Sequence, residues 1–164
     1  MKIFINSGQG HGETMISAFD TALFDAGIHN YNLIKLSSIV PPQSEIQVNV
    51  KRKVDHDEYG RRLYVVMAEK RSRESGKYIG AALGWYQIED GRGVFVEHEE
   101  IGETKQSVRA NLTEEVRKSL ANLCQLRKFP FSAEKTKMEL SITKVTDSPA
   151  CALVTAIYQS EPWE

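Results

Sequence analysis

The side chains best suited to chemistry lie between residues 30 and 42, where a short strand is followed by a constrained turn. Alternation along the strand predicted for residues 31–36 puts Asn32 on its more apolar face, where a buried amide needs hydrogen-bond partners. Ser37 and Ser38 follow this strand, and Pro41-Pro42 restricts the backbone just beyond them. Serine hydroxyls are potential nucleophiles, but serine is also an ordinary turn residue. These residues alone therefore predict only a strand that ends at a forced turn.

Two carboxylates are further candidates. Glu97 follows a hydrophobic run, 93–96, and a carboxyl group in apolar surroundings can serve as a general acid. It is also the first residue of an acidic run, 97–100, and could simply be exposed. Asp20 lies on the rim of a helix's apolar stripe, so it could face water or bind a guanidinium through paired hydrogen bonds. The pattern leaves both alternatives open for each residue.

Two weaker signals point to other functions. The run Gly8-Gln9-Gly10-His11-Gly12 lies between a predicted strand and a predicted helix, as a phosphate-binding loop would. Its GxGxG spacing is not GxGxxG, however, and no Gly-Lys-Ser/Thr follows, so nucleotide binding is a minor alternative. The four histidines have no ligand spacing, and we expect no metal site; they are His11, His29, His56 and His98.

The apolar pattern predicts two helices among many strands. One helix is expected over 15–26 with Gly27 as its cap, and a second over roughly 103–126. Asp90-Gly91 predicts a hairpin between the strands that flank it. The fold class is therefore expected to be α+β, a four-layer αββα sandwich of mostly antiparallel sheets with outer helices. The predicted strands cover residues 2–6, 31–36, 45–50, 63–69, 78–88, 93–99, 138–145 and 150–158.

Composition limits the class of protein. The chain has 164 residues with 41% hydrophobic content, which predicts a single domain over 1–164. Its net charge of -1 gives no field that would attract nucleic acid, and no stretch is long and apolar enough to span a membrane. We expect a cytoplasmic protein whose two cysteines are reduced. The most polar stretch, 51–62, is the segment most expected to be flexible.

A spaced set of motifs changes the interpretation of the serine pair. Together these motifs resemble the pyruvoyl-dependent arginine decarboxylases, densely from about residue 10 to residue 45 and more weakly at 93–97 and along the second helix. The segments that carry the resemblance are Gly12-Glu13-Thr14, Ala18-Phe19-Asp20, Ala22-Leu23, Ala26-Gly27-Ile28, Asn30, Asn32-Leu33-Ile34 and Ser37-Ser38-Ile39-Val40-Pro41-Pro42.

The resemblance implies that the chain is a proenzyme that cuts itself between Ser37 and Ser38. The Ser38 hydroxyl would attack the preceding carbonyl, and the resulting ester would eliminate and hydrolyse to a pyruvoyl group and ammonia. The products would be a short β chain, 1–37, and a longer α chain, 38–164, that carries a covalent pyruvoyl group made from Ser38. Self-processing needs a donor for the developing oxyanion, and Asn32 suits that role.

The resemblance also implies the activity, that of a carbon-carbon lyase that decarboxylates L-arginine to agmatine and CO2 without pyridoxal phosphate or metal. The pyruvoyl ketone would take up the substrate's α-amine, and Glu97 would be the proton donor. Asp20 would bind the distal cation, with Ser37 and Ile39 also contacting substrate. Homotrimers with active sites between subunits are expected, serving polyamine synthesis or acid resistance.

Some alternatives stay open. His29 and the stretch 9–11 depart from the family pattern, so the substrate could be another basic amino acid, such as ornithine or lysine, while chain length disfavours histidine. A non-catalytic relative that stays unprocessed and binds a small metabolite is a further possibility.

Overall fold

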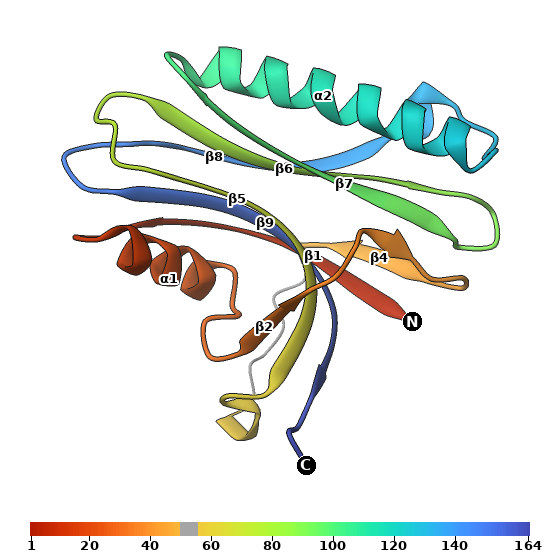
Figure 1. Cartoon of the computed structure of the whole chain (residues 1–164), viewed down its shortest axis with the longest axis horizontal. Helices are drawn as coiled ribbons and strands as arrows, with labels where there is room; N and C mark the ends of the chain where they lie inside the picture. The colour runs from red at the N-terminus through yellow and green to blue at the C-terminus, as the bar shows by residue number, and fades with distance from the viewer. Residues whose placement is uncertain (50–55) are drawn as a thin grey trace.

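A computed structural model describes residues 1–49 and 56–164 of the chain (Figure 1). The stretch predicted to be flexible, 51–62, lies in part outside the described residues. The helices are α1 (Met15–Asp25) and α2 (Lys105–Leu126), with short 3-10 turns at His56–Glu58 and Ala133–Lys135. The strands are β1 (Lys2–His11), β2 (Asn32–Lys35), β3 (Ile39–Val40), β4 (Glu45–Val48), β5 (Arg62–Ser72), β6 (Tyr78–Gln87), β7 (Gly93–Gly102), β8 (Lys137–Lys144) and β9 (Ala150–Glu161).

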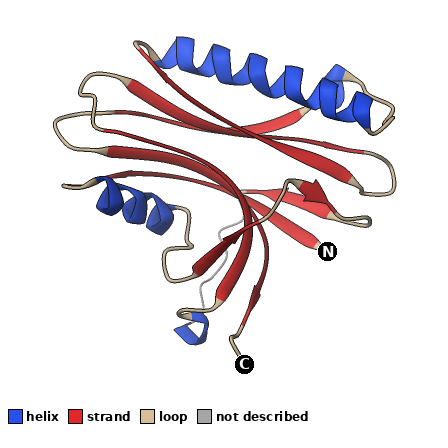
Figure 2. Cartoon of the chain, in the orientation of Figure 1, coloured by secondary structure: helices blue, strands red, loops and turns tan. Residues whose placement is uncertain are grey.

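The strands form two stacked sheets, one in the order β2-β5-β9-β1-β4 and the other in the order β3-β7-β6-β8. We call them the first and the second sheet. Pairing is antiparallel except between β1 and β4 and between β2 and β5. Figure 2 shows how far strands predominate over helices. The prediction of an α+β sandwich with mostly antiparallel sheets is confirmed.

Three apolar layers hold the four structural layers together. Helix α1 covers the outer face of the first sheet, and α2 covers the outer face of the second (Figure 1). Between the sheets lies an inner core, which is built from β1, β3, β5, β6, β7 and β9. Each helix therefore buries one apolar stripe, as the spacing of its residues predicts. Among the described residues, no helix is long and apolar enough to cross a membrane.

Residues 8–11 of the glycine-rich stretch belong to strand β1 rather than to a phosphate-binding loop, because β1 extends to His11 and only Gly12 lies beyond it. A Cβ on Gly8 would lie 2.1 Å from the Ala22 carbonyl oxygen, and one on Gly10 would lie 2.4 Å from the Ala18 carbonyl oxygen. These glycines let the backbone of α1 pack directly against the sheet. Close helix packing thus accounts for the glycines.

The predicted ends of the elements are confirmed at two turns. Asp90-Gly91 joins β6 to β7, which pair antiparallel, and Gly91 has a φ of 85°. Gly27 has a φ of 77° just after α1, where only glycine adopts the left-handed conformation without strain. Thr14 caps the start of this helix by accepting a hydrogen bond from the Ser17 backbone.

Candidate active site

The Ser37–Ser38 peptide lies where the chain crosses from one sheet to the other. On one side of it, the Leu36 N–H donates to the Val65 carbonyl of β5 at 2.8 Å, in the first sheet. On the other side, the Ser38 carbonyl accepts from the Phe95 N–H of β7 at 2.8 Å, in the second sheet. The crossing is thus anchored on both sides to different layers. Neither serine has a positive φ, so this crossing shows no left-handed backbone strain.

Ser38 and Glu97 lie in contact although they are 59 residues apart in sequence. The Ser38 Oγ donates to both carboxylate oxygens of Glu97, at 2.8 Å to Oε1 and 2.7 Å to Oε2. Strand β3 pairs antiparallel with β7, with Ile39 opposite Val94, and this pairing brings Ser38 into reach of Glu97. Glu97 is half-buried, which argues against a merely exposed acidic run. A carboxylate so placed can accept the proton of the hydroxyl.

A pocket of about 340 Å³ opens beside this pair. One wall comes from β7, and the other comes from α2 through Ser119, Asn122 and Leu123. Next to it, the His98 ring and the Ser119 hydroxyl share a hydrogen bond of 2.8 Å, which fixes the strand against the helix. No pattern in the sequence indicated that α2 takes part in the site, because its contribution depends on how the helix lies over the sheet.

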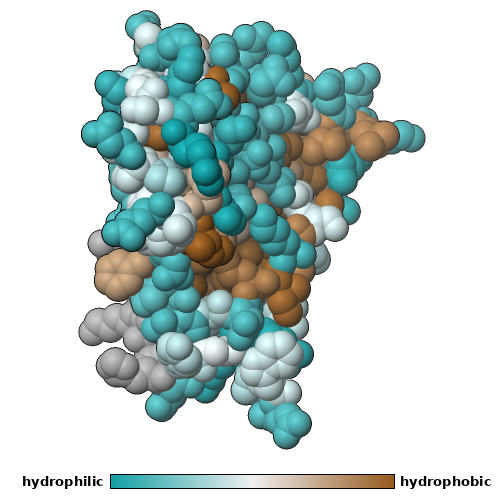
Figure 3. Space-filling view, turned by 60° about the vertical axis from the view of Figure 1, so that its left-hand side comes forward, coloured by the Kyte–Doolittle hydropathy of each residue, from teal (hydrophilic) through white to brown (hydrophobic). Residues whose placement is uncertain are grey.

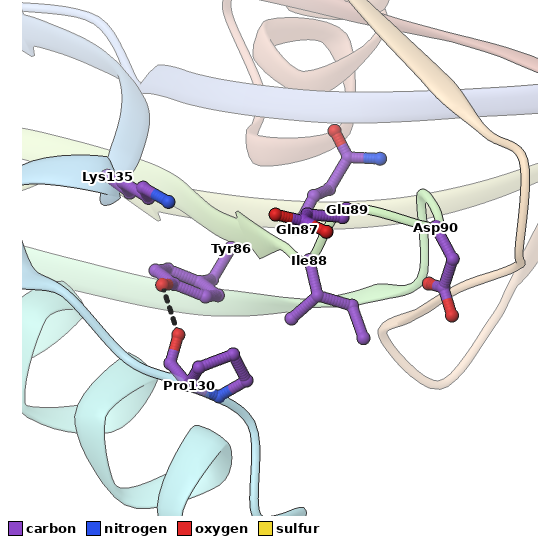
Figure 4. A pocket seen from close by; sticks show the side chains of 7 residues that line it. All are labelled: Tyr86, Gln87, Ile88, Glu89, Asp90, Pro130 and Lys135. Atoms are coloured by element: carbon purple, nitrogen blue, oxygen red, sulfur yellow. Dashed lines mark hydrogen bonds between the residues drawn. The ribbon is translucent and has the colours of Figure 1, made fainter.

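A larger pocket of about 510 Å³ lies at the end of β6, around Tyr86, Pro130 and Lys135 (Figure 4). None of the residues with predicted roles lines it. The Tyr86 hydroxyl donates to the Pro130 carbonyl at 2.7 Å, and this bond ties the segment after α2 to the sheet (Figure 4). Because Ser38 and Glu97 line the smaller of these two pockets, we take that pocket as the candidate active site.

Tyr158 is a site residue that the sequence reasoning missed, because it ends an apolar run that indicates only a strand. Its hydroxyl donates to the Ile39 carbonyl at 2.8 Å, one residue beyond Ser38. Its ring packs edge-on against Phe95, with centroids 6.3 Å apart. Burial, and to a lesser extent the negative charge of Glu97, raises the pKa of the Tyr158 hydroxyl. Tyr158 is therefore a neutral donor beside the serine–glutamate pair.

The prediction that Asn32 is buried is wrong. Asn32 is exposed, and its side-chain amide donates to the Gly60 carbonyl at 2.7 Å. Asn32 is the first residue of β2, which is an edge strand of the first sheet. Its position on the more apolar side of that strand is therefore not enough to bury its side chain. Leu36, beyond the other end of β2, does pack against the inner core. Asn32 and Ser38 thus lie at opposite ends of this segment, and a role for Asn32 as oxyanion donor stays a prediction.

Asp20 does not lie near the serine–glutamate pair within one chain. It is exposed on α1, which covers the first sheet, whereas Glu97 lies on β7 in the second sheet. Ser37 and Ile39 are exposed beside Ser38 and could contact a ligand there. One chain therefore brings together Ser38 and Glu97 with their neighbours, but not Asp20 or Asn32.

Comparisons with known proteins agree on one family. The family model for pyruvoyl-dependent arginine decarboxylase matches residues 2–162. A protein of that name from Thermoplasma volcanium is 36% identical over 64% of this chain and 58% of its own length. Another from Methanocella arvoryzae is 36% identical over 64% of each chain, and one from Picrophilus torridus is 35% identical over 63% of this chain and 58% of its own length. The matched part thus spans about six-tenths of these relatives.

Proposed function

Because the chain belongs to the pyruvoyl-dependent arginine decarboxylase family, we propose that it is a self-processing proenzyme that converts L-arginine to agmatine and CO2. The observation that carries the proposal is the contact of the Ser38 hydroxyl with Glu97 at the crossing between the sheets. A family match names a class of reaction, whereas this contact supplies a nucleophile and a proton acceptor at one peptide bond.

Self-cleavage begins when Glu97 accepts the hydroxyl proton and the Ser38 Oγ bonds to the Ser37 carbonyl carbon. The Ser37–Ser38 C–N bond breaks as the Ser38 nitrogen takes up that proton, which leaves an ester, and loss of the Ser38 α-proton then expels the Ser37 carboxylate. Addition of one water to the remaining group releases ammonia and leaves a pyruvoyl terminus. The fragment 1–37 would stay in place, because β1 pairs with β4 and β9, and β2 pairs with β5.

The surroundings of Ser38 suit a pyruvoyl group, which would supply an electron-withdrawing carbonyl next to the substrate's reacting carbon. The Phe95 N–H already holds the Ser38 carbonyl at 2.8 Å, so it can stabilise negative charge that develops on that oxygen. Glu97 would hold the proton that is delivered to the α-carbon after CO2 departs.

A trimer would explain why Asp20 and Asn32 lie away from the site of their own chain. Each could complete the site of a neighbouring copy, with Asp20 binding the guanidinium of arginine. Hydrophobic areas on the surface are consistent with contact between copies (Figure 3). Ile39, beside Ser38, is one of the exposed large apolar residues, with 49% of its surface accessible.

Replacing Asp20 tests the assignment of arginine. We expect Asp20→Asn to cleave itself normally and to raise KM for arginine roughly 10-fold or more, because a charge-assisted hydrogen-bond pair to the guanidinium is lost. Asp147→Asn is the matched control, since Asp147 is exposed on the turn between β8 and β9. Steady-state kinetics of the cleaved proteins measure the effect, and an unchanged KM in Asp20→Asn would remove Asp20 from the substrate site.

The proposed activity is tested by incubating the purified protein with arginine, ornithine, lysine and histidine in parallel. Agmatine and CO2 from arginine, at a kcat/KM well above those for the other three, are the expected result. Turnover of ornithine or lysine instead would support the proposed decarboxylation but would overturn arginine as the substrate. An uncut chain that binds arginine saturably and forms no agmatine would make the protein a non-catalytic binding relative.

A further inference from the structure

Tyr158 occupies an irregular position in its strand. Strands β5 and β9 pair Tyr64 with Gln159 and then Val65 with Ile157, so Tyr158 is the extra residue of a β-bulge. Such bulges re-aim a side chain and are over-represented beside active sites. Here the side chain reaches from the first sheet into the inner core and meets β3 of the second sheet. The bulge therefore places a tyrosine hydroxyl directly after the serine pair.

Two successive carbonyls that follow the scissile peptide are held by this arrangement. The Ser38 carbonyl accepts from the Phe95 N–H, and the Ile39 carbonyl accepts from the Tyr158 hydroxyl, each at 2.8 Å. The rings of Phe95 and Tyr158 meet at an interplanar angle of 65°, in an edge-on contact that fixes both residues. Only 9% of the Tyr158 surface is exposed, so water cannot easily replace its hydroxyl.

Building on the proposed function, we propose that Tyr158 is a positioning residue for both self-cleavage and decarboxylation. By holding the Ile39 carbonyl it fixes the backbone on the far side of Ser38, and so keeps the Ser38 hydroxyl aimed at Glu97. After cleavage the same bond still holds the Ile39 carbonyl, one residue beyond the new terminus, and so helps to keep the carbonyl at position 38 on the Phe95 N–H. Tyr158 does not line the pocket, so it acts through the backbone rather than on the substrate.

The test compares Tyr158→Phe with Tyr86→Phe. Tyr86 is a matched control because its buried hydroxyl also donates to a backbone carbonyl, that of Pro130, away from the candidate site (Figure 4). Both proteins are made by cell-free synthesis, and the appearance of the two chains is followed over time on denaturing gels. We expect Tyr158→Phe to cleave about 10-fold more slowly than wild type. The Ile39 carbonyl loses its hydrogen-bond donor in this variant, and the Ser38 hydroxyl is then less well aligned with Glu97. Tyr86→Phe should cleave at the wild-type rate.

Kinetics of the cleaved fraction and thermal unfolding separate positioning from mere stability. We expect the Tyr158→Phe enzyme to have a kcat about 10-fold lower with KM within twofold of wild type, and a Tm close to that of Tyr86→Phe. Wild-type rates of cleavage and turnover in Tyr158→Phe would overturn the role of Tyr158, as would a Tm far below that of the control. A wild-type chain that stays uncut would instead overturn the proposed function, and this inference with it.

Discussion

Ser38→Ala is expected to yield a single uncut chain without decarboxylase activity. The substitution removes the hydroxyl that lies 2.7 and 2.8 Å from the Glu97 carboxylate oxygens, and with it the nucleophile and the source of the pyruvoyl group. Because an alanine has neither an atom that can attack the Ser37 carbonyl nor a leaving group for the elimination, the loss should be complete rather than partial. Denaturing electrophoresis shows the uncut chain, and an agmatine assay measures the missing activity.

Ser37→Ala is the matched control for this loss. It removes a neighbouring exposed hydroxyl but keeps the Ser38 nucleophile, so this variant should still produce two chains. An active Ser38→Ala enzyme would exclude a pyruvoyl group made from Ser38. Cleavage that fails in Ser37→Ala and proceeds in Ser38→Ala would move the nucleophile to the neighbouring serine.

Glu97→Gln is expected to have the second largest effect. The amide keeps the size of the side chain but cannot accept the hydroxyl proton or deliver one to the substrate. Self-cleavage should slow, and the cleaved fraction should turn over arginine roughly 10² to 10⁴-fold more slowly, the usual contribution of general acid–base catalysis. A time course on denaturing gels gives the first rate, and kcat of the isolated cleaved protein gives the second.

Glu99→Gln serves as the control, because Glu99 is an exposed residue of the same strand and loses the same charge. Its cleavage and turnover should stay within about twofold of wild type, as expected for an exposed carboxylate that does not line the pocket. Should the cleaved Glu97→Gln enzyme work as fast as Glu99→Gln, the proton donor would have to be another group.

Local signals in the sequence predicted much of the fold. The glycine of Asp90-Gly91 indicated a hairpin because a tight turn needs a positive φ, and the structure has that turn between antiparallel strands. The spacing along α1 and α2 indicated which stripe each helix buries. Both depend on short-range chemistry. The extension of β1 through Gly10 was missed, because glycines in a sequence usually indicate a loop. Here they are needed for the close packing of α1 on the strand, which the sequence does not reveal.

The site was less predictable because its contacts are long-range. Glu97 was chosen by resemblance, and its contact with Ser38 depends on a two-residue strand, β3, pairing with β7. Tyr158 depends on a bulge, which no local pattern specifies. Asn32 shows the opposite error: alternation indicates a side of the strand, but whether that side is covered depends on where the sheet ends.

The intact mass of the purified wild-type protein under denaturing conditions tests most directly whether the chain cuts itself between Ser37 and Ser38. We expect two species, one with the mass of residues 1–37 and one with that of residues 38–164 carrying a pyruvoyl terminus. Their masses should sum to that of the precursor plus one water minus one ammonia. A single species with the unmodified mass of all 164 residues, in a preparation that produces agmatine, would contradict self-cleavage as the source of the activity.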